Sequence, residues 1–133
     1  MLKKGAKMQY LSVLAGGAMG ALLRYLSTQG ISGLIKTPFP AGTLLVNMIG
    51  SLVIGFLFGV FETRAVPAGL RLFLITGFLG GYTTFSSYSL ETVRLFLAGN
   101  ISAAFINLAL NNLLCLGFTF LGLGLSQKLV AHV

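Results

Sequence analysis

Four stretches of the chain are long and apolar enough to cross a lipid bilayer, for which a helix needs about 20 mostly apolar residues. These stretches are residues 8–26, 41–61, 70–97 and 101–125. Only three residues separate the third stretch from the fourth, so these two helices must form an antiparallel hairpin. The pattern therefore predicts an all-α membrane protein, with one four-helix transmembrane domain over residues 1–133.

The third stretch is interrupted by small and hydroxylated residues. From Thr76 to Ser89 it reads TGFLGGYTTFSSYS, which contains three glycines and six Ser or Thr residues. Backbone N–H and C=O groups that face hydrocarbon without a partner cost several kcal/mol each. We therefore predict that the third helix breaks within the membrane, and that the broken backbone is buried in protein or lines a wet cavity.

The connecting segments carry their own signals. Residues 27–40 form the longest connection, where Ile31, Leu34 and Ile35 predict a short interfacial helix that Pro38 and Pro40 end. The second connection, residues 62–68, is predicted to be an ordinary loop. The first apolar stretch is too long for the core of a signal peptide, so we interpret it as a retained helix.

Charge is scarce and lies mainly beside the predicted helices. Charged residues make up 8% of the chain, against roughly 25% in soluble domains, and the mean hydropathy is +0.93. The net charge of +7 therefore indicates lipid headgroups and not nucleic acid. The basic residues assigned to one side are Lys3, Lys4, Lys7, Arg64, Arg71 and Lys128, against Lys36 and Arg94 on the other. This bias predicts that both termini are cytoplasmic.

The few ionisable residues exclude several kinds of chemistry. The acidic residues are Glu62 and Glu91, both near predicted helix ends, and the only histidine is His132. Glu91 has two possible roles, the end of a polar pathway or, as is commoner, a solvated carboxylate at a helix end. Proton-coupled transporters usually need a carboxylate or histidine within the membrane, so coupled transport is disfavoured. Serine has no His or Asp partner for hydrolysis, and metal-binding Cys and His clusters are absent from the sequence. We do not expect an enzyme.

Neutral polar side chains instead form two stripes at helical spacing. One is Thr43, Asn47 and Ser51; the other is Asn107, Asn111, Cys115 and Thr119. Such residues commonly join membrane helices by hydrogen bonds. Their position beside a broken helix also fits the wall of a pore, and the residues alone leave both interpretations open.

Within the interrupted stretch, Phe85 and Tyr88 stand three residues apart and share a face if the helix has resumed there. Aromatic ring edges, amide N–H groups and hydroxyls all present partial positive charge without a formal cation. Such groups suit the passage of a small anion, which must bind strongly enough to lose water and weakly enough to leave. Packing alone is the alternative explanation for the two rings.

Arg24 and two pairs of glycines complete the membrane inventory. Arg24 has three possible roles, which are snorkelling, pairing with freed carbonyls and attracting anions. The pairs at small-xxx-small spacing, which allows helix backbones to approach closely, are Gly16 with Gly20 and Gly55 with Gly59. Because one small chain would leave such faces unpaired, we predict an oligomer.

Three motifs together resemble the Fluc or CrcB family of small bacterial fluoride channels. They are GGAMGALLRY from Gly16, PAGTLLVNMIGS from Pro40 and GFLGGYTTFSSYSLET from Gly77. The resemblance implies a passive, fluoride-selective channel in the bacterial inner membrane, which lets fluoride leave the cell. It also implies that two copies pair in opposite orientations and hold a structural sodium ion on backbone carbonyls, here those of Gly80 and Thr83.

The same resemblance assigns a fluoride pathway. Asn47 matches the pore asparagine, Phe85 the first pore phenylalanine and Tyr88 the second, where this sequence departs from the family pattern. The remaining pathway residues implied are Thr43, Thr84, Ser87, Asn111 and Cys115. Arg24 matches a characteristic family arginine with an electrostatic or structural role. The identity of the ion comes from the resemblance alone.

Two other functions and one question about assembly stay open. A small drug or cation exporter shares four helices and dual topology, but relies on a carboxylate within the membrane. A non-transporting assembly subunit would use the polar stripes only to join helices. A chain that inserts both ways should have balanced flanking charge, so the bias described above leaves open a homodimer or a pair with a sister chain.

Overall fold

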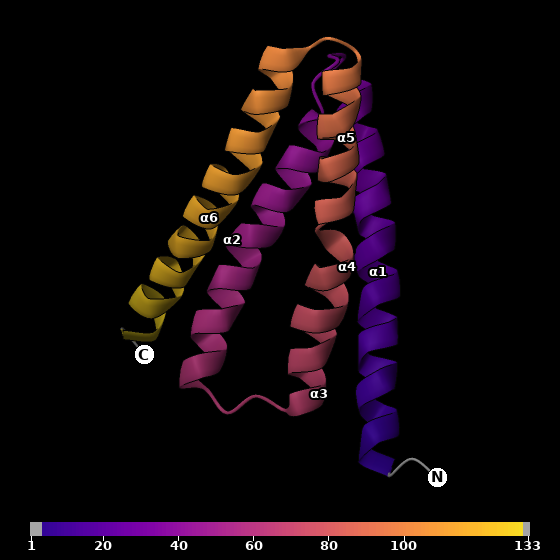
Figure 1. Ribbon diagram of the computed structural model, residues 1–133. Coiled ribbons are helices and arrows are strands. Elements are labelled where there is room, and N and C mark those ends of the chain that lie inside the picture. The colour runs from indigo at the N-terminus through magenta and orange to yellow at the C-terminus, as the bar shows by residue number, and fades with distance from the viewer. Residues whose placement is uncertain (1–3, 132–133) are drawn as a thin grey trace.

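The computed structural model describes residues 4–131, and within this range every regular element is helical (Figure 1). Lys3 and His132, used in the sequence analysis, lie outside the described residues. The elements in chain order are α1 (Lys4–Leu34), α2 (Ala41–Thr63), α3 (Ala68–Arg71), the π-helix η1 (Leu72–Leu79), α4 (Gly80–Tyr82), α5 (Phe85–Leu97) and α6 (Ile101–Ala131). The hairpin between α5 and α6 turns at Gly99, whose φ of 78° favours glycine.

The elements form four rods, which run roughly along the long axis of the molecule (Figure 1). α1, α2 and α6 are single rods, and the fourth is built in succession from α3, η1, α4 and α5. α2 packs mainly on α6, and α1 packs mainly on η1 and α4. The N-terminal end of α1 and the C-terminal end of α6 lie toward the same end of the molecule as the loop between α2 and α3 (Figure 1).

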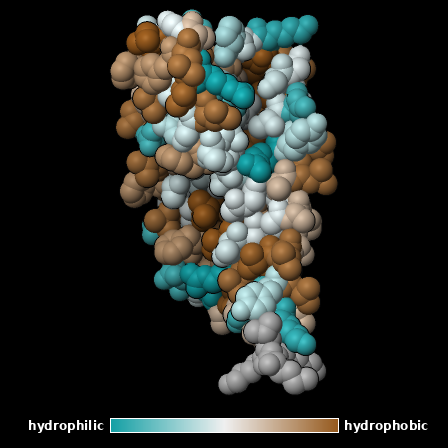
Figure 2. Space-filling view, turned by 45° about the vertical axis from the view of Figure 1, so that its right-hand side comes forward, coloured by the Kyte–Doolittle hydropathy of each residue, from teal (hydrophilic) through white to brown (hydrophobic). Residues whose placement is uncertain are grey.

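Two helices, Ala41–Thr63 and Ile101–Val130, are long and apolar enough to cross a membrane by length and composition. The surface supports this reading, because apolar side chains spread along the face in Figure 2, with hydrophilic residues mostly toward its ends. Exposed examples are Leu14 at 67%, Leu113 at 69% and Phe120 at 73%. Exposed apolar surface of this extent indicates contact with lipid or with another protein.

The predicted break in the third rod is confirmed. The backbone leaves helical geometry at Thr83, with ψ of 157°, and at Thr84, with φ of −150° and ψ of 112°. The segment before the break is not a regular α-helix either, because η1 is a π-helix of eight residues. Such π-helical segments are rare and occur frequently at functional sites.

The predicted interfacial helix between residues 27 and 40 is wrong, because α1 continues to Leu34. Ile31 and Leu34 belong to α1, and the Ile35 N–H donates to the Ile31 carbonyl at 2.8 Å. The stop comes only near Pro38, since neither Gly30 nor Gly33 suffices to end a helix.

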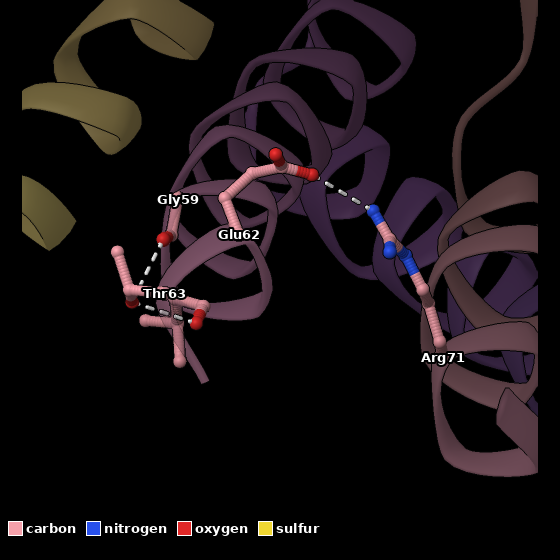
Figure 3. Close-up of polar contacts among 5 residues, drawn as sticks. Gly59, Glu62, Thr63 and Arg71 are labelled. Carbon is pink, nitrogen blue, oxygen red and sulfur yellow. Dashed lines mark hydrogen bonds and ion pairs between the residues drawn. The ribbon is translucent and has the colours of Figure 1, made fainter. Parts of the chain in front are cut away.

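The loop between α2 and α3 is tied by an ion pair (Figure 3). Arg71 contacts Glu62 at 3.2 Å, with both side chains about half exposed. Close by, the Thr63 hydroxyl donates to the carbonyls of Gly59 and Val60 (Figure 3). An exposed pair contributes about 0–1 kcal/mol, but Glu62 offsets one of the positive charges counted at this end.

The glycines predicted to allow close helix packing do so within the chain. A Cβ added at Gly16 or Gly20 would overlap the backbone of the third rod, at Phe73 or Phe78. A Cβ added at Gly55 would overlap the Thr119 backbone of α6, and one added at Gly59 would overlap the Ser126 side chain of α6. These faces are therefore occupied and do not argue for an oligomer, contrary to our reasoning from the sequence.

The contact between α1 and the third rod predicts opposite effects for neighbouring glycines. Gly20→Ala should lower the free energy of unfolding by about 1–3 kcal/mol, because the new methyl group overlaps backbone that cannot move aside. Gly17→Ala, whose Cβ would come no closer than 3.9 Å to the Gly77 carbonyl oxygen, should be neutral or stabilise by up to about 1 kcal/mol. Thermal unfolding in detergent micelles, followed by circular dichroism, checks this. Equal stability of the two variants would contradict the packing described.

Candidate functional site

Asn47 of α2 holds the backbone at the break in the third rod. Its side-chain Oδ1 accepts from the Thr84 N–H at 2.9 Å, and its Nδ2 donates to the Thr84 carbonyl at 3.1 Å. One amide thus satisfies both backbone groups of a residue that belongs to no helix. Buried backbone groups require such partners, particularly at membrane depth.

Thr84 also restarts the helix beyond the break. Its hydroxyl oxygen accepts from the Ser87 N–H at 3.1 Å, which is an N-cap, and its hydroxyl donates to the Ser87 side chain at 3.0 Å. Threonine and serine are among the preferred residues at this position. The hydroxyls of Thr84 and Ser87, predicted to line a fluoride pathway, are therefore engaged in capping α5.

A chain of buried amides runs from Asn47 along α6. The second Asn47 N–H donates to Asn111 Oδ1 at 3.1 Å, and Asn111 Nδ2 donates to Asn107 Oδ1 at 2.9 Å. Asn107 then donates to the Thr92 hydroxyl at 2.9 Å, which donates to the Tyr88 carbonyl. All four polar side chains are buried. At these positions the structure supports helix joining, one of the two interpretations left open.

A cavity of about 380 Å³ lies beside the break, between α2, α5 and α6. Six of the predicted pathway residues line it, namely Asn47, Thr84, Phe85, Tyr88, Asn111 and Cys115. The other lining residues are Ser51, Ile54, Thr83, Asn112, Leu116 and Thr119. None of these twelve described residues carries a formal charge. Thr43 and Ser87, also predicted, are not among them.

The two aromatic residues share a face, as predicted. Their rings meet edge to face, with centroids 5.2 Å apart and an interplanar angle of 67°. Phe85 is 76% exposed, whereas Tyr88 is 5% exposed. The Tyr88 hydroxyl accepts from Asn112 Nδ2 at 3.0 Å. Sequence reasoning missed Asn112, because it lies one residue away from the polar stripe on α6.

Glu91 is not the solvated helix-end carboxylate that we expected. Its Oε1 accepts from the Thr43 hydroxyl at 2.7 Å, and its Oε2 is buried without a hydrogen-bond partner among residues 4–131. Thr43 therefore joins Glu91, one helical turn from Asn47, and does not reach the cavity. The sequence signal that could have indicated a buried partner for Thr43 is its position on the same face of α2 as Asn47, four residues earlier.

The two carbonyls predicted to hold sodium lose their helical donors at the break. In a continuous helix the Thr84 N–H would bond the Gly80 carbonyl, but it bonds Asn47 instead. Similarly, the Ser87 N–H bonds the Thr84 hydroxyl and not the Thr83 carbonyl. No cluster of three or more His, Cys, Asp or Glu able to hold a metal occurs in the described part of the chain. Arg24 is half-buried on α1 and does not line the cavity.

Comparison with known proteins identifies the family to which this chain belongs. Residues 11–123 match the family described as CrcB-like protein, Camphor Resistance (CrcB). The chain belongs to the CrcB-like family. This match includes the break, the amide chain and every residue that lines the cavity.

Curated relatives of this CrcB-like protein carry the name Fluoride-specific ion channel FluC. The relative from Azotobacter vinelandii is 48% identical over 118 residues, which cover 88% of this chain and 95% of that protein. The relative from Hydrogenobaculum sp. is 44% identical over 119 residues, covering 88% and 94%. A third, from Campylobacter fetus, is 43% identical over 117 residues, covering 87% and 91%. The resemblance inferred from three motifs is thereby confirmed, and the chain is a membrane protein.

The two hydrogen bonds between the Asn47 amide and the Thr84 backbone, called the clamp below, predict that Asn47 contributes to stability independently of transport. Asn47→Leu, of similar size, should leave the Thr84 N–H and carbonyl without partners and cost about 1–3 kcal/mol for each. Hydrogen exchange measured by mass spectrometry should show faster exchange at Thr84, together with a lower unfolding midpoint. Ser51→Ala, which removes a hydroxyl from the same cavity one turn along α2, serves as the control. Unchanged exchange at Thr84 in Asn47→Leu would contradict the clamp.

Proposed function

We propose that this CrcB-like protein is a fluoride-selective channel, by which fluoride leaves the cytoplasm passively across the bacterial inner membrane. The observation that carries the proposal is the uncharged cavity beside the broken helix, whose largely apolar wall includes amide, hydroxyl and thiol side chains. The names of the relatives supply the ion. Hydrogen fluoride crosses membranes as a neutral weak acid and ionises inside, so a channel for the anion relieves accumulation without an energy source.

The chemistry of the cavity suits transient binding of a dehydrated anion. A fixed cation would hold the anion too firmly, whereas ring edges, hydroxyls and a thiol offer weaker attraction. The exposed ring of Phe85 and the side chains of Ser51 and Cys115 are the groups closest to this description. Asn47 and Asn111 contribute by fixing the wall, because their amide hydrogens are all donated to protein groups.

A second copy in the opposite orientation would complete this pathway. Phe85 lines the cavity and yet is 76% exposed in the single chain, so one side of the pathway has no protein wall. An exposed apolar ring at the edge of a cavity is a natural site for contact with a partner. The biased flanking charge leaves both partners possible, a second copy or a sister chain.

A sodium ion between the two copies fits the freed carbonyls. Hard cations prefer oxygen ligands, including backbone carbonyls, and the carbonyls of Gly80 and Thr83 lose their helical donors. Two copies would contribute four such oxygens. The ion would supply positive charge to backbone that lipid cannot satisfy, and would join the copies at their breaks.

The half-buried carboxylate of Glu91 is the one observation that favours an exporter, because proton coupling uses such a group. Its partner Thr43 lies on the polar stripe that leads to Asn47. Flux that requires a proton gradient would support the exporter, and flux driven by the fluoride gradient alone supports the channel.

Liposomes that contain the purified protein should release fluoride far faster than chloride. Phe85→Ala should lower the fluoride rate by about two- to tenfold, since a ring contact contributes about 0.5–1.5 kcal/mol. Phe120→Ala, of similar exposure on α6 but outside the cavity, is the matched control. A fluoride-selective electrode measures the efflux. Equal rates for the two halides would remove the selectivity proposed.

Removal of sodium should weaken the pair of copies. Exchange of sodium for a large organic cation should lower the fraction of chains that a crosslinker traps as dimer in micelles. It should also lower the unfolding midpoint, because a ligand at 100 times its Kd stabilises by about 2.7 kcal/mol. Potassium serves as the control for ionic strength. A dimer fraction and unfolding midpoint independent of sodium would contradict the site.

A further inference from the structure

Tyr88 carries a hydroxyl at the cavity wall, and Asn112 is bonded to it. Tyr88 belongs to α5 and Asn112 to α6, and both line the same cavity. The distance from Asn112 Nδ2 to Tyr88 Oη is 3.0 Å. The phenol is 5% exposed, so the state of its hydroxyl is set by neighbours and by whatever enters the cavity.

The direction of this hydrogen bond is fixed by a second one. Asn112 Nδ2 also lies 2.7 Å from the Leu108 carbonyl oxygen. A carbonyl can only accept, so the atom beside it must be the NH₂ group and not the amide oxygen. The same NH₂ group faces Tyr88, and it has no acceptor capacity. The Tyr88 oxygen is therefore the acceptor, and its own proton must be donated elsewhere.

No acceptor for that proton occurs among residues 4–131, since the only hydrogen bond of the Tyr88 hydroxyl is the one from Asn112. An amide that donates to a hydroxyl also polarises it and strengthens it as a donor. The Tyr88 ring itself is buried and packs edge to face against Phe85. The orientation of the ring and that of the hydroxyl are thus set by different neighbours.

We propose that Asn112 is a positioning residue that orients the Tyr88 hydroxyl to donate its proton to a small anion in the cavity. This inference rests on the proposed function. It adds a hydroxyl donor to the ring edge at this position, and makes that donor depend on a residue of α6 that need not touch the ion.

Two substitutions separate this role from packing. Asn112→Leu removes the hydrogen bond at similar volume. Asn112→Asp is nearly isosteric but reverses the bond, because a carboxylate accepts the phenol proton and takes it from the cavity. Each is made in the natural chain and in Tyr88→Phe, which keeps the ring and lacks the hydroxyl.

In liposomes, Asn112→Leu and Tyr88→Phe should each lower the fluoride rate by about fivefold, the usual contribution of one hydrogen bond. Their combination should be no slower than Tyr88→Phe alone. Asn112→Asp should slow fluoride more in the natural chain than in Tyr88→Phe, where only its charge acts. Equal effects in both backgrounds, or no effect, would overturn the proposal.

Raman spectra provide a readout that does not depend on transport. The intensity ratio of the tyrosine doublet distinguishes a phenol that accepts from one that donates, and subtraction of the Tyr88→Phe spectrum isolates Tyr88. Without fluoride the natural chain should show an acceptor, added fluoride should shift it to a phenol that both accepts and donates, and Asn112→Asp should shift it to a donor. A donor in the natural chain without fluoride, or no response to fluoride, would overturn the inference. Absence of fluoride flux in the natural chain counts instead against the proposed function.

Discussion

The pairing between one side-chain amide and one residue of backbone is the constraint on which the site depends. Thr84 lies in extended conformation between two helical segments, and Asn47 satisfies both its N–H and its carbonyl. Without these bonds the break would leave unpaired groups in an apolar environment, at a cost of about 1–3 kcal/mol for each. With them, the N–H that would close the helix is diverted, and the Gly80 carbonyl is freed. The clamp and the freed oxygen are two consequences of the same bond.

The two halves of the third rod are held by different means. Before the break, glycines of α1 lie directly against the backbone of η1 and α4, so little side-chain volume separates them. Beyond the break, α5 contacts α6 through hydrogen bonds such as that of Asn107 with Thr92. Hydrophobic burial gives no driving force between helices in lipid, so close packing and polar bonds must supply it. The cavity lies where the second arrangement replaces the first.

The sequence predicted the architecture well because its signals are local. Apolar length, the short turn at Gly99 and the glycines around residues 77–81 each act within one or two turns. It predicted the extent of α1 and the environment of Glu91 poorly. The end of a helix depends on the position of a residue that terminates it, such as proline. The environment of the Glu91 carboxylate depends on its hydrogen bond with Thr43, which lies 48 residues away in the sequence. The sequence also did not predict which atom of each asparagine amide faces which partner, because these partners lie on other helices. Asn112 was missed because it lies one residue off the polar stripe on α6, and its partner Tyr88 is on another helix.

The amide directions bear on how a neutral pathway can select an anion. An asparagine placed in a cavity offers both a donor and an acceptor, and a free amide could turn either group toward an ion. Here Asn47 and Asn111 are bonded in one sense, with the Asn47 oxygen committed to the Thr84 N–H. The Asn47 and Asn111 oxygens are thereby withdrawn from the cavity, and the Phe85 ring edge and the Tyr88 hydroxyl hydrogen present partial positive charge beside it. The network that holds the break open thus also engages two of the amide oxygens that would attract a cation, which fits the anion pathway proposed above without a fixed positive residue.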